Sequence, residues 1–156
     1  MNLFRKLKKN LDESQMNLKI INSISEELAL YLIGQDGVAE GDGFDAIYPN
    51  DTTPASNLPD SYLEILGNGP LYTRVSQGGV KDYALMLIVN TKLLSVGSVN
   101  TIRENYLLGL LDKYIGDQLV LGQFHYSIDK NNMVYSGKSL TDGYSTKIIN
   151  INVKIY

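Results

Sequence analysis

His125 is the only histidine of the chain and the first candidate for a general base or a metal ligand. It stands between Phe124 and Tyr126 in a segment that alternates like a β-strand, so its side chain points away from both neighbours. The chain holds no cysteine, and no carboxylate stands at a spacing that would pair with this histidine. A structural or surface histidine is therefore the preferred interpretation.

Other chemistry-bearing motifs are absent or incomplete. No phosphate-binding loop, dinucleotide fingerprint or nucleophile elbow occurs. The acidic pairs Asp12-Glu13 and Glu26-Glu27 diverge by about 100° on a helix, so neither forms a converging acid–base pair. Residues 34–43 are acidic and glycine-rich but lack the ligand spacing of an EF-hand, which favours a flexible connection. We expect no catalytic, cofactor-binding or metal-binding residues and no enzyme, although a site built from distant residues stays open.

The composition indicates one globular domain. The 156 residues are enough to bury a substantial core, and 44% of them are hydrophobic. A net charge of -3 argues against a nucleic-acid-binding protein, which usually carries a basic excess. No apolar run has the length of a signal peptide or a membrane span. These features predict a cytosolic protein without a membrane partner.

Helical spacing predicts an N-terminal helical region. Residues 1–22 form a possible separate helix or arm. Its basic face could contact a membrane surface or a polyanion, but a solvated basic face is the preferred interpretation. A capping box at Ser23 and Glu26 predicts the start of a second helix, which ends at Gly34, although the apolar residues before Ser23 allow an earlier start. In residues 1–22 the apolar residues at helical spacing are Leu3, Phe4, Leu7 and Leu11, and the basic residues between them are Arg5, Lys6, Lys8 and Lys9.

A third helix is predicted from Ser98 to about Ile115, with Gly116 as its stop. Gly109 lies in its interior, where it costs about 1 kcal/mol relative to alanine and would allow close backbone packing. The expected core stripe contains Val99, Ile102, Tyr106, Leu110 and Tyr114, widened by Leu107 and Leu111.

The remaining segments read as strands and loops. Strands do not alternate regularly with helices, so we expect a single α+β domain with a mostly antiparallel, possibly mixed, sheet and two to three helices. The predicted strands cover residues 44–48, 82–91, 124–128, 133–136 and 149–155, and a hairpin turns at residues 67–70. The 82–91 strand is expected to be covered on both faces. A proline-rich loop occupies residues 49–61.

Five segments carry a family resemblance across nearly the whole chain. They are the opening helix with Leu3, Phe4 and Leu7; Ala46-Ile47-Tyr48-Pro49 with its loop; the strand at 85–89; the helix with Ile102, Leu107 and Leu111; and Asp142-Gly143-Tyr144 followed by 149–156. Together they resemble the tail terminator family of long-tailed bacteriophages, also described as minor capsid or tail completion proteins. Residues 130–139 and the 49–61 loop do not match that pattern.

The resemblance implies a small α+β subunit that forms a ring, usually a hexamer, on the tail tube. Such a ring ends tube polymerisation and presents the surface that joins the head. The implied partners are further copies of the chain, the tail tube protein and the head–tail connector protein, with no specific nucleic-acid sequence and no cofactor. The implied location is the head-proximal end of the virion tail, after assembly in the host cytoplasm.

A ring requires two complementary patches on each subunit, and loops or open strand edges are the predicted contributors. Alternatives stay open: another virion or tube component such as a head–tail connector subunit, a small ligand-binding domain, or an enzyme with a hidden site. The candidate interface residues come from the proline-rich loop and the turns at 67–70 and 78–81. They are Tyr48, Pro49, Asp51, Pro54, Tyr62, Asn68, Tyr72, Arg74, Gly79 and Lys81.

Overall fold

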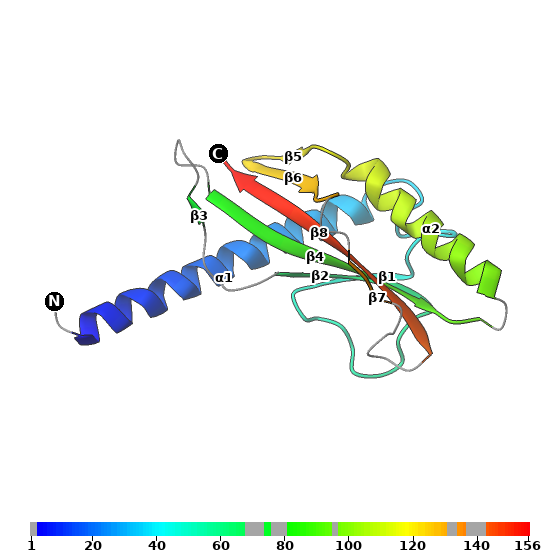
Figure 1. Ribbon diagram of the computed structural model, residues 1–156, viewed down its shortest axis with the longest axis horizontal. Coiled ribbons are helices and arrows are strands. Elements are labelled where there is room, and N and C mark those ends of the chain that lie inside the picture. Colours follow the sequence, from blue (N-terminus) through cyan, green and yellow to red (C-terminus); the bar gives the residue numbers. More distant parts are fainter. Residues whose placement is uncertain (1–2, 68–73, 76–80, 95–96, 131–133, 137–142) are drawn as a thin grey trace.

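A computed structural model of the chain describes residues 3–67, 74–75, 81–94, 97–130, 134–136 and 143–156. The elements are α1 (Leu3–Ile33), β1 (Ala46–Pro49), β2 (Ser61–Gly67), β3 (Arg74–Val75), β4 (Lys81–Lys92), α2 (Gly97–Tyr114), β5 (Leu119–Leu121), β6 (Phe124–Ile128), β7 (Val134–Ser136) and β8 (Tyr144–Ile155). The strands form one sheet in the order β1-β2-β4-β8-β6-β5, with β3 paired to β4 and β7 paired to β8 (Figure 1). The predicted α+β class is confirmed, and the sheet is mixed because β1 and β2 run parallel.

α1 is one unbroken helix of 31 residues, so the predicted helix start at Ser23 is wrong. No glycine or proline occurs within the helix, and nothing in its sequence forces a break. The helix ends one residue before Gly34, whose N–H donates to the carbonyls of Leu30 and Tyr31. Figure 1 shows the N-terminal part of α1 extending beyond the sheet.

The core lies between the helices and one face of the sheet. The two long strands β4 and β8 pair along their whole length, and their inward residues meet in register, as Leu85 does with Ile151. The alternation predicted for residues 149–155 is confirmed, because Ile149, Ile151 and Val153 are buried. The helical residues packed in this core include Ile24, Leu28 and Leu32 of α1 and Leu107 and Leu111 of α2.

The other face of the sheet remains partly open. Ala84, Met86 and Ile88 of β4 are only half-buried there, so the prediction that this strand is covered on both sides is wrong. Residues 50–60 lie against one end of this face. The Thr53 hydroxyl donates to the Glu64 carboxylate at 2.8 Å, and the Tyr144 hydroxyl reaches the Pro59 carbonyl at 2.8 Å.

The parallel pairing of β1 with β2 explains the length of the proline-rich loop. Parallel neighbours cannot be joined by a tight turn, because the chain must return to the end at which the first strand began. Residues 50–60 make that return, from the end of β1 at Pro49 to the start of β2 at Ser61. The topology therefore accounts for the loop without a functional role.

The predicted hairpin at residues 67–70 is wrong in its pairing. β2 pairs with β4, from Ser61 opposite Thr91 to Gly67 opposite Leu85. The short strand β3 also pairs with β4, where it continues the line of β2. The short strand β7 pairs with β8.

Candidate interaction surfaces

The predicted interface residues are spread over several places. Tyr48 and Pro49 are half-buried on the edge strand β1, and Asp51 and Pro54 are exposed on the following loop. Lys81 is exposed at the start of β4. Asn68, Tyr72 and Gly79 lie outside the described residues, and for Arg74 only the backbone pairing in β3 is described.

Tyr62 does not fit the role of an interface aromatic, because it is only 2% exposed. Its ring lies edge-on between those of Tyr48 and Tyr144, with centroid separations of 5.9 and 5.7 Å. Edge-to-face rings at this separation stabilise a folded domain. Tyr62 therefore helps to hold β1 and β8 together and has little surface to offer a partner.

A polar network beside these rings fixes the loop to the sheet. The two carboxylate oxygens of Glu64 accept hydrogen bonds from Asn90 at 2.9 Å and Thr53 at 2.8 Å. The buried Thr146 hydroxyl donates to the side-chain oxygen of Asn90 at 3.0 Å. Because both Glu64 oxygens are hydrogen-bonded, this carboxylate is better suited to anchoring the loop than to abstracting a proton.

His125 lies half-buried on β6, and its ring centroid is 4.4 Å from that of Tyr156. Within the described residues, no group of three or more histidines and carboxylates could hold a metal ion. Burial raises the pKa of Tyr83, Tyr126 and Tyr144, which keeps these phenols neutral. In the described part of the chain, no helix combines the length and apolarity needed to cross a lipid bilayer.

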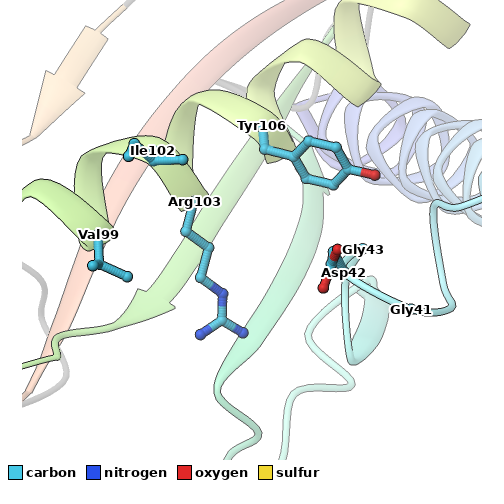
Figure 2. A pocket seen from close by; sticks show the side chains of 7 residues that line it. All are labelled: Gly41, Asp42, Gly43, Val99, Ile102, Arg103 and Tyr106. Atoms are coloured by element: carbon cyan, nitrogen blue, oxygen red, sulfur yellow. The ribbon is translucent and has the colours of Figure 1, made fainter.

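A groove of about 360 Å³ lies between α2 and the loop that follows α1. We call it the α2 groove; it is lined by Gly41, Asp42, Gly43, Val99, Ile102, Arg103 and Tyr106. Figure 2 shows the side chains of Arg103 and Tyr106 extending from α2 toward the loop that carries Asp42. Ile102 is 71% exposed, and Val99 and Tyr106 are also exposed, so this is a surface groove with an apolar floor.

The α2 groove was not predicted from the sequence. The stripe expected to face the core is confirmed only in part. Leu107, Leu110 and Leu111 are buried, whereas Val99, Ile102 and Tyr106 are exposed. The width of that stripe was the one sequence feature that could have indicated the groove, because an amphipathic helix packs against a core with only one apolar face. The excess apolar residues on α2 form the second face.

The loop beside the groove is folded onto the domain and is not the flexible connection expected for residues 34–43. Val38 and Phe44 are buried, and the Phe44 N–H donates to the Val38 carbonyl at 2.6 Å. The N–H of Gly37 donates to the Glu40 carboxylate at 3.0 Å. The loop therefore gives the groove a fixed rim. The Asp45 carboxylate at the end of this loop lies 4.0 Å from the Arg103 guanidinium of α2, with which it forms an ion pair.

The first part of α1, residues 3–19, is a projecting arm. None of its described side chains is buried, and Leu3 is 67% exposed. Exposed apolar residues gather on it, and apolar patches on soluble proteins mark interaction sites. They are Leu3, Phe4, Leu7, Met16 and Leu18.

A second groove of about 410 Å³ runs where α1 meets the end of β2. Asp51, one of the predicted interface residues, lines it together with Leu18 and Leu66. Asn50 closes one side, because its amide donates to the Asn22 carbonyl of α1 at 3.0 Å. Leu18 belongs to the arm, so the arm and this groove form a continuous surface.

No protein-family model matches this chain, and no curated protein matches it.

Proposed function

We propose that this chain is a structural subunit of a bacteriophage tail, which caps the tail tube, ends its polymerisation and provides the surface that joins the head. The observation that carries the assembly role is the exposure of apolar side chains at both ends of a well-packed domain. Leu3 and Leu7 are exposed on the arm, and Ile102 is exposed in the α2 groove. Exposed apolar surface of this kind is unfavourable in water for a free monomer, and its presence is explained if the subunit buries these residues against partners.

The phage-specific part rests on the resemblance of segment order and length to tail terminators. A single α+β domain with a mixed sheet agrees with the fold which that resemblance implies. The proposed partners are further copies in a ring, the tail tube protein and the head–tail connector protein. The proposed location is the head-proximal end of the tail in the virion.

We also propose that the chain has no catalytic role. Two half-buried carboxylates are engaged: Glu64 with Asn90 and Thr53, and Glu104 with Thr91 at 3.2 Å and Lys147 at 3.9 Å. The buried Oδ1 of half-buried Asp82 has no hydrogen-bond partner among the described residues, but no metal-binding group surrounds it there. Apart from the buried Gly43, the residues lining the α2 groove are exposed or half-exposed, whereas small-molecule sites enclose most of their ligand. A groove of this shape suits a protein segment better than a small substrate.

Tube assembly in vitro tests the proposal. A tail tube protein from the same phage would be polymerised with and without this chain, and tube lengths would be measured by electron microscopy. We expect shorter tubes that carry a ring at one end. Heat-denatured chain serves as the control and should leave the lengths unchanged.

The same experiment separates the competing roles. Unchanged tube lengths, together with binding to the head-side connector, would contradict the terminator role and favour a connector subunit. Binding to neither component would contradict both.

A further inference from the structure

We propose that residues 3–9 of one copy dock in the α2 groove of the next copy. This inference deepens the proposed function, because it names the two surfaces that join neighbouring subunits. It rests on that function only for its biological setting, since the contact itself concerns two copies of this chain.

The arm has the chemistry of a segment that seats in a groove. Leu3 and Leu7 are one helical turn apart and both exposed, and Phe4 beside them is 78% exposed. Residues 3–9 also carry four basic side chains and no acidic one. An amphipathic helix of this kind places its apolar face in a hydrophobic groove and its charges on the rim.

The α2 groove has the complementary chemistry. Its floor carries Val99, Ile102 and Tyr106 on successive turns of one helix face. The loop of residues 34–45, of which residues 41–43 line the groove, holds four acidic side chains and no basic one. These are Asp36, Glu40, Asp42 and Asp45, and all four are exposed. Residues 34–45 together with Arg103 of the groove lining carry a net charge of -3, which is opposite in sign to the four basic side chains of the arm.

The arm cannot reach the groove of its own molecule. α1 is continuous over 31 residues, which makes it about 46 Å long. The groove lies beyond the C-terminal end of that helix, where the Tyr31 hydroxyl donates to the Tyr114 carbonyl of α2 at 3.1 Å. Figure 1 places the N-terminus and α2 at opposite ends of the molecule. Docking must therefore join two molecules.

A contact between the arm of one copy and the groove of the next is heterologous, because the two copies contribute different surfaces to it. Contacts of this type close into rings or continue as filaments. A membrane is the competing partner for a basic amphipathic arm, but anionic lipid would repel the acidic groove and leave its apolar floor uncovered. A second copy satisfies both surfaces at once.

Two double variants and their mixture test the inference. Leu3→Gln/Leu7→Gln removes the apolar face of the arm, and Val99→Gln/Ile102→Gln removes the floor of the groove. All four positions are exposed, so both variants should fold, which circular dichroism checks. Leu30→Gln is the matched control, because Leu30 is 72% exposed but lies outside the groove lining.

Sedimentation measures the outcome. We expect wild type and Leu30→Gln to associate alike, and each double variant to dissociate with a Kd at least about 100-fold higher. An equimolar mixture of the two double variants should form dimers and nothing larger, because it contains one intact arm type and one intact groove type.

Two outcomes would overturn the inference. One is a wild type that stays monomeric at every concentration, in which case binding to vesicles of anionic lipid would identify a membrane as the partner of the arm. The other is a groove variant that associates like wild type. Neither of these bears on tube length, so the capping role would stand or fall separately. Conversely, tubes of unchanged length with intact arm–groove association would contradict the capping role alone.

Discussion

Tyr126 links the sheet to α1 at a fully buried position. Its hydroxyl donates to the Ile24 carbonyl at 2.9 Å. Burial raises the pKa of this phenol, and the negative charge of Glu27 raises it further. The neutral phenol is thus the form that the folded protein requires.

This linkage predicts a loss of stability in alkali. Above the ordinary tyrosine pKa of 10.0 the unfolded chain releases a proton that the folded chain retains, so the free energy of unfolding falls as pH rises. The slope for one proton is about 1.4 kcal/mol per pH unit. Below that pH the contribution is complete and constant.

Tyr126→Phe checks the assignment by urea unfolding on either side of pH 10. We expect a cost of about 1 kcal/mol at neutral pH from the lost hydrogen bond, and a shallower decline in alkali. The decline should not vanish, since the pKa values of Tyr83 and Tyr144 are also raised. Equal alkaline slopes in both proteins would show that Tyr126 is not responsible.

For single residues, the sequence predicted which strand face a side chain lies on better than it predicted whether that side chain is buried. The position of His125 in a strand was predictable from alternation, and the strand β6 is confirmed. The burial of Tyr62 was not predictable, because it depends on Tyr144, which lies 82 positions later in the chain. Alternation identifies the two faces of a strand but does not reveal what covers the outer one.

Among the elements, the edge strands limit one mode of association. The edge strands of the described sheet are all short: β1 has four residues and ends at Pro49, β5 and β7 have three each, and β3 has two. Short edges and a terminal proline offer few free backbone groups to a neighbouring strand. Extension of the sheet between subunits, which the sequence had suggested, is therefore less favoured than contacts made by helices.

Replacing Gly43 or Gly109 by alanine should change the stability of the domain in opposite directions, because an added methyl group would meet different surroundings at the two positions. A Cβ at Gly43 would overlap the carbonyl oxygens of Gly37 and Val38, so Gly43→Ala should destabilise the domain by about 1–3 kcal/mol. At Gly109 no described heavy atom lies within 4 Å of the added carbon. Gly109→Ala should therefore stabilise α2 by about 0.5–1 kcal/mol.

Thermal unfolding of the two variants measures both effects. The close backbone packing that the sequence suggested at Gly109 is not present within the described chain. A destabilising Gly109→Ala would show that the glycine meets a contact which the described residues do not provide.

Helix and strand identities followed from the sequence better than their partners did. α2 lies within one residue of its predicted limits, and β8 ends close to its predicted limit, because capping residues and period-two alternation are local signals. β8 begins at Tyr144, however, five residues before the predicted start. The parallel pairing of β1 with β2 has no local signal, and its long loop was therefore open to a functional interpretation. The full extent of α1 was only an open alternative, because Ser23 and Glu26 mimic a cap inside a continuous apolar stripe.

For the whole molecule, the proposed arm–groove contact predicts a salt-dependent association. Opposite charges on the arm and the groove rim attract over about 10 Å at 0.1 M salt but only about 3 Å at 1 M. We expect sedimentation to show weaker association as salt rises. An apolar contact without charge complementarity would be unchanged or strengthened.

A charge exchange provides the control. Lys6→Glu and Asp42→Lys should each weaken association, and the combined variant should recover part of it. Additive weakening in the combined variant would contradict a direct approach of the arm to the groove rim.

The continuity of α1 also has a consequence for when the arm is ordered. A free peptide of the arm's length would be marginally helical, because starting a helix carries a factor of about 10⁻³, equivalent to about 4 kcal/mol. Here the buried half of α1, with Ile24, Leu28 and Leu32, supplies the nucleus, and residues 3–19 only propagate it. The arm is thus helical before it meets a partner, and it loses that helix when the core unfolds. Only a correctly folded chain can present it, so misfolded chains would be excluded from the proposed arm–groove contact.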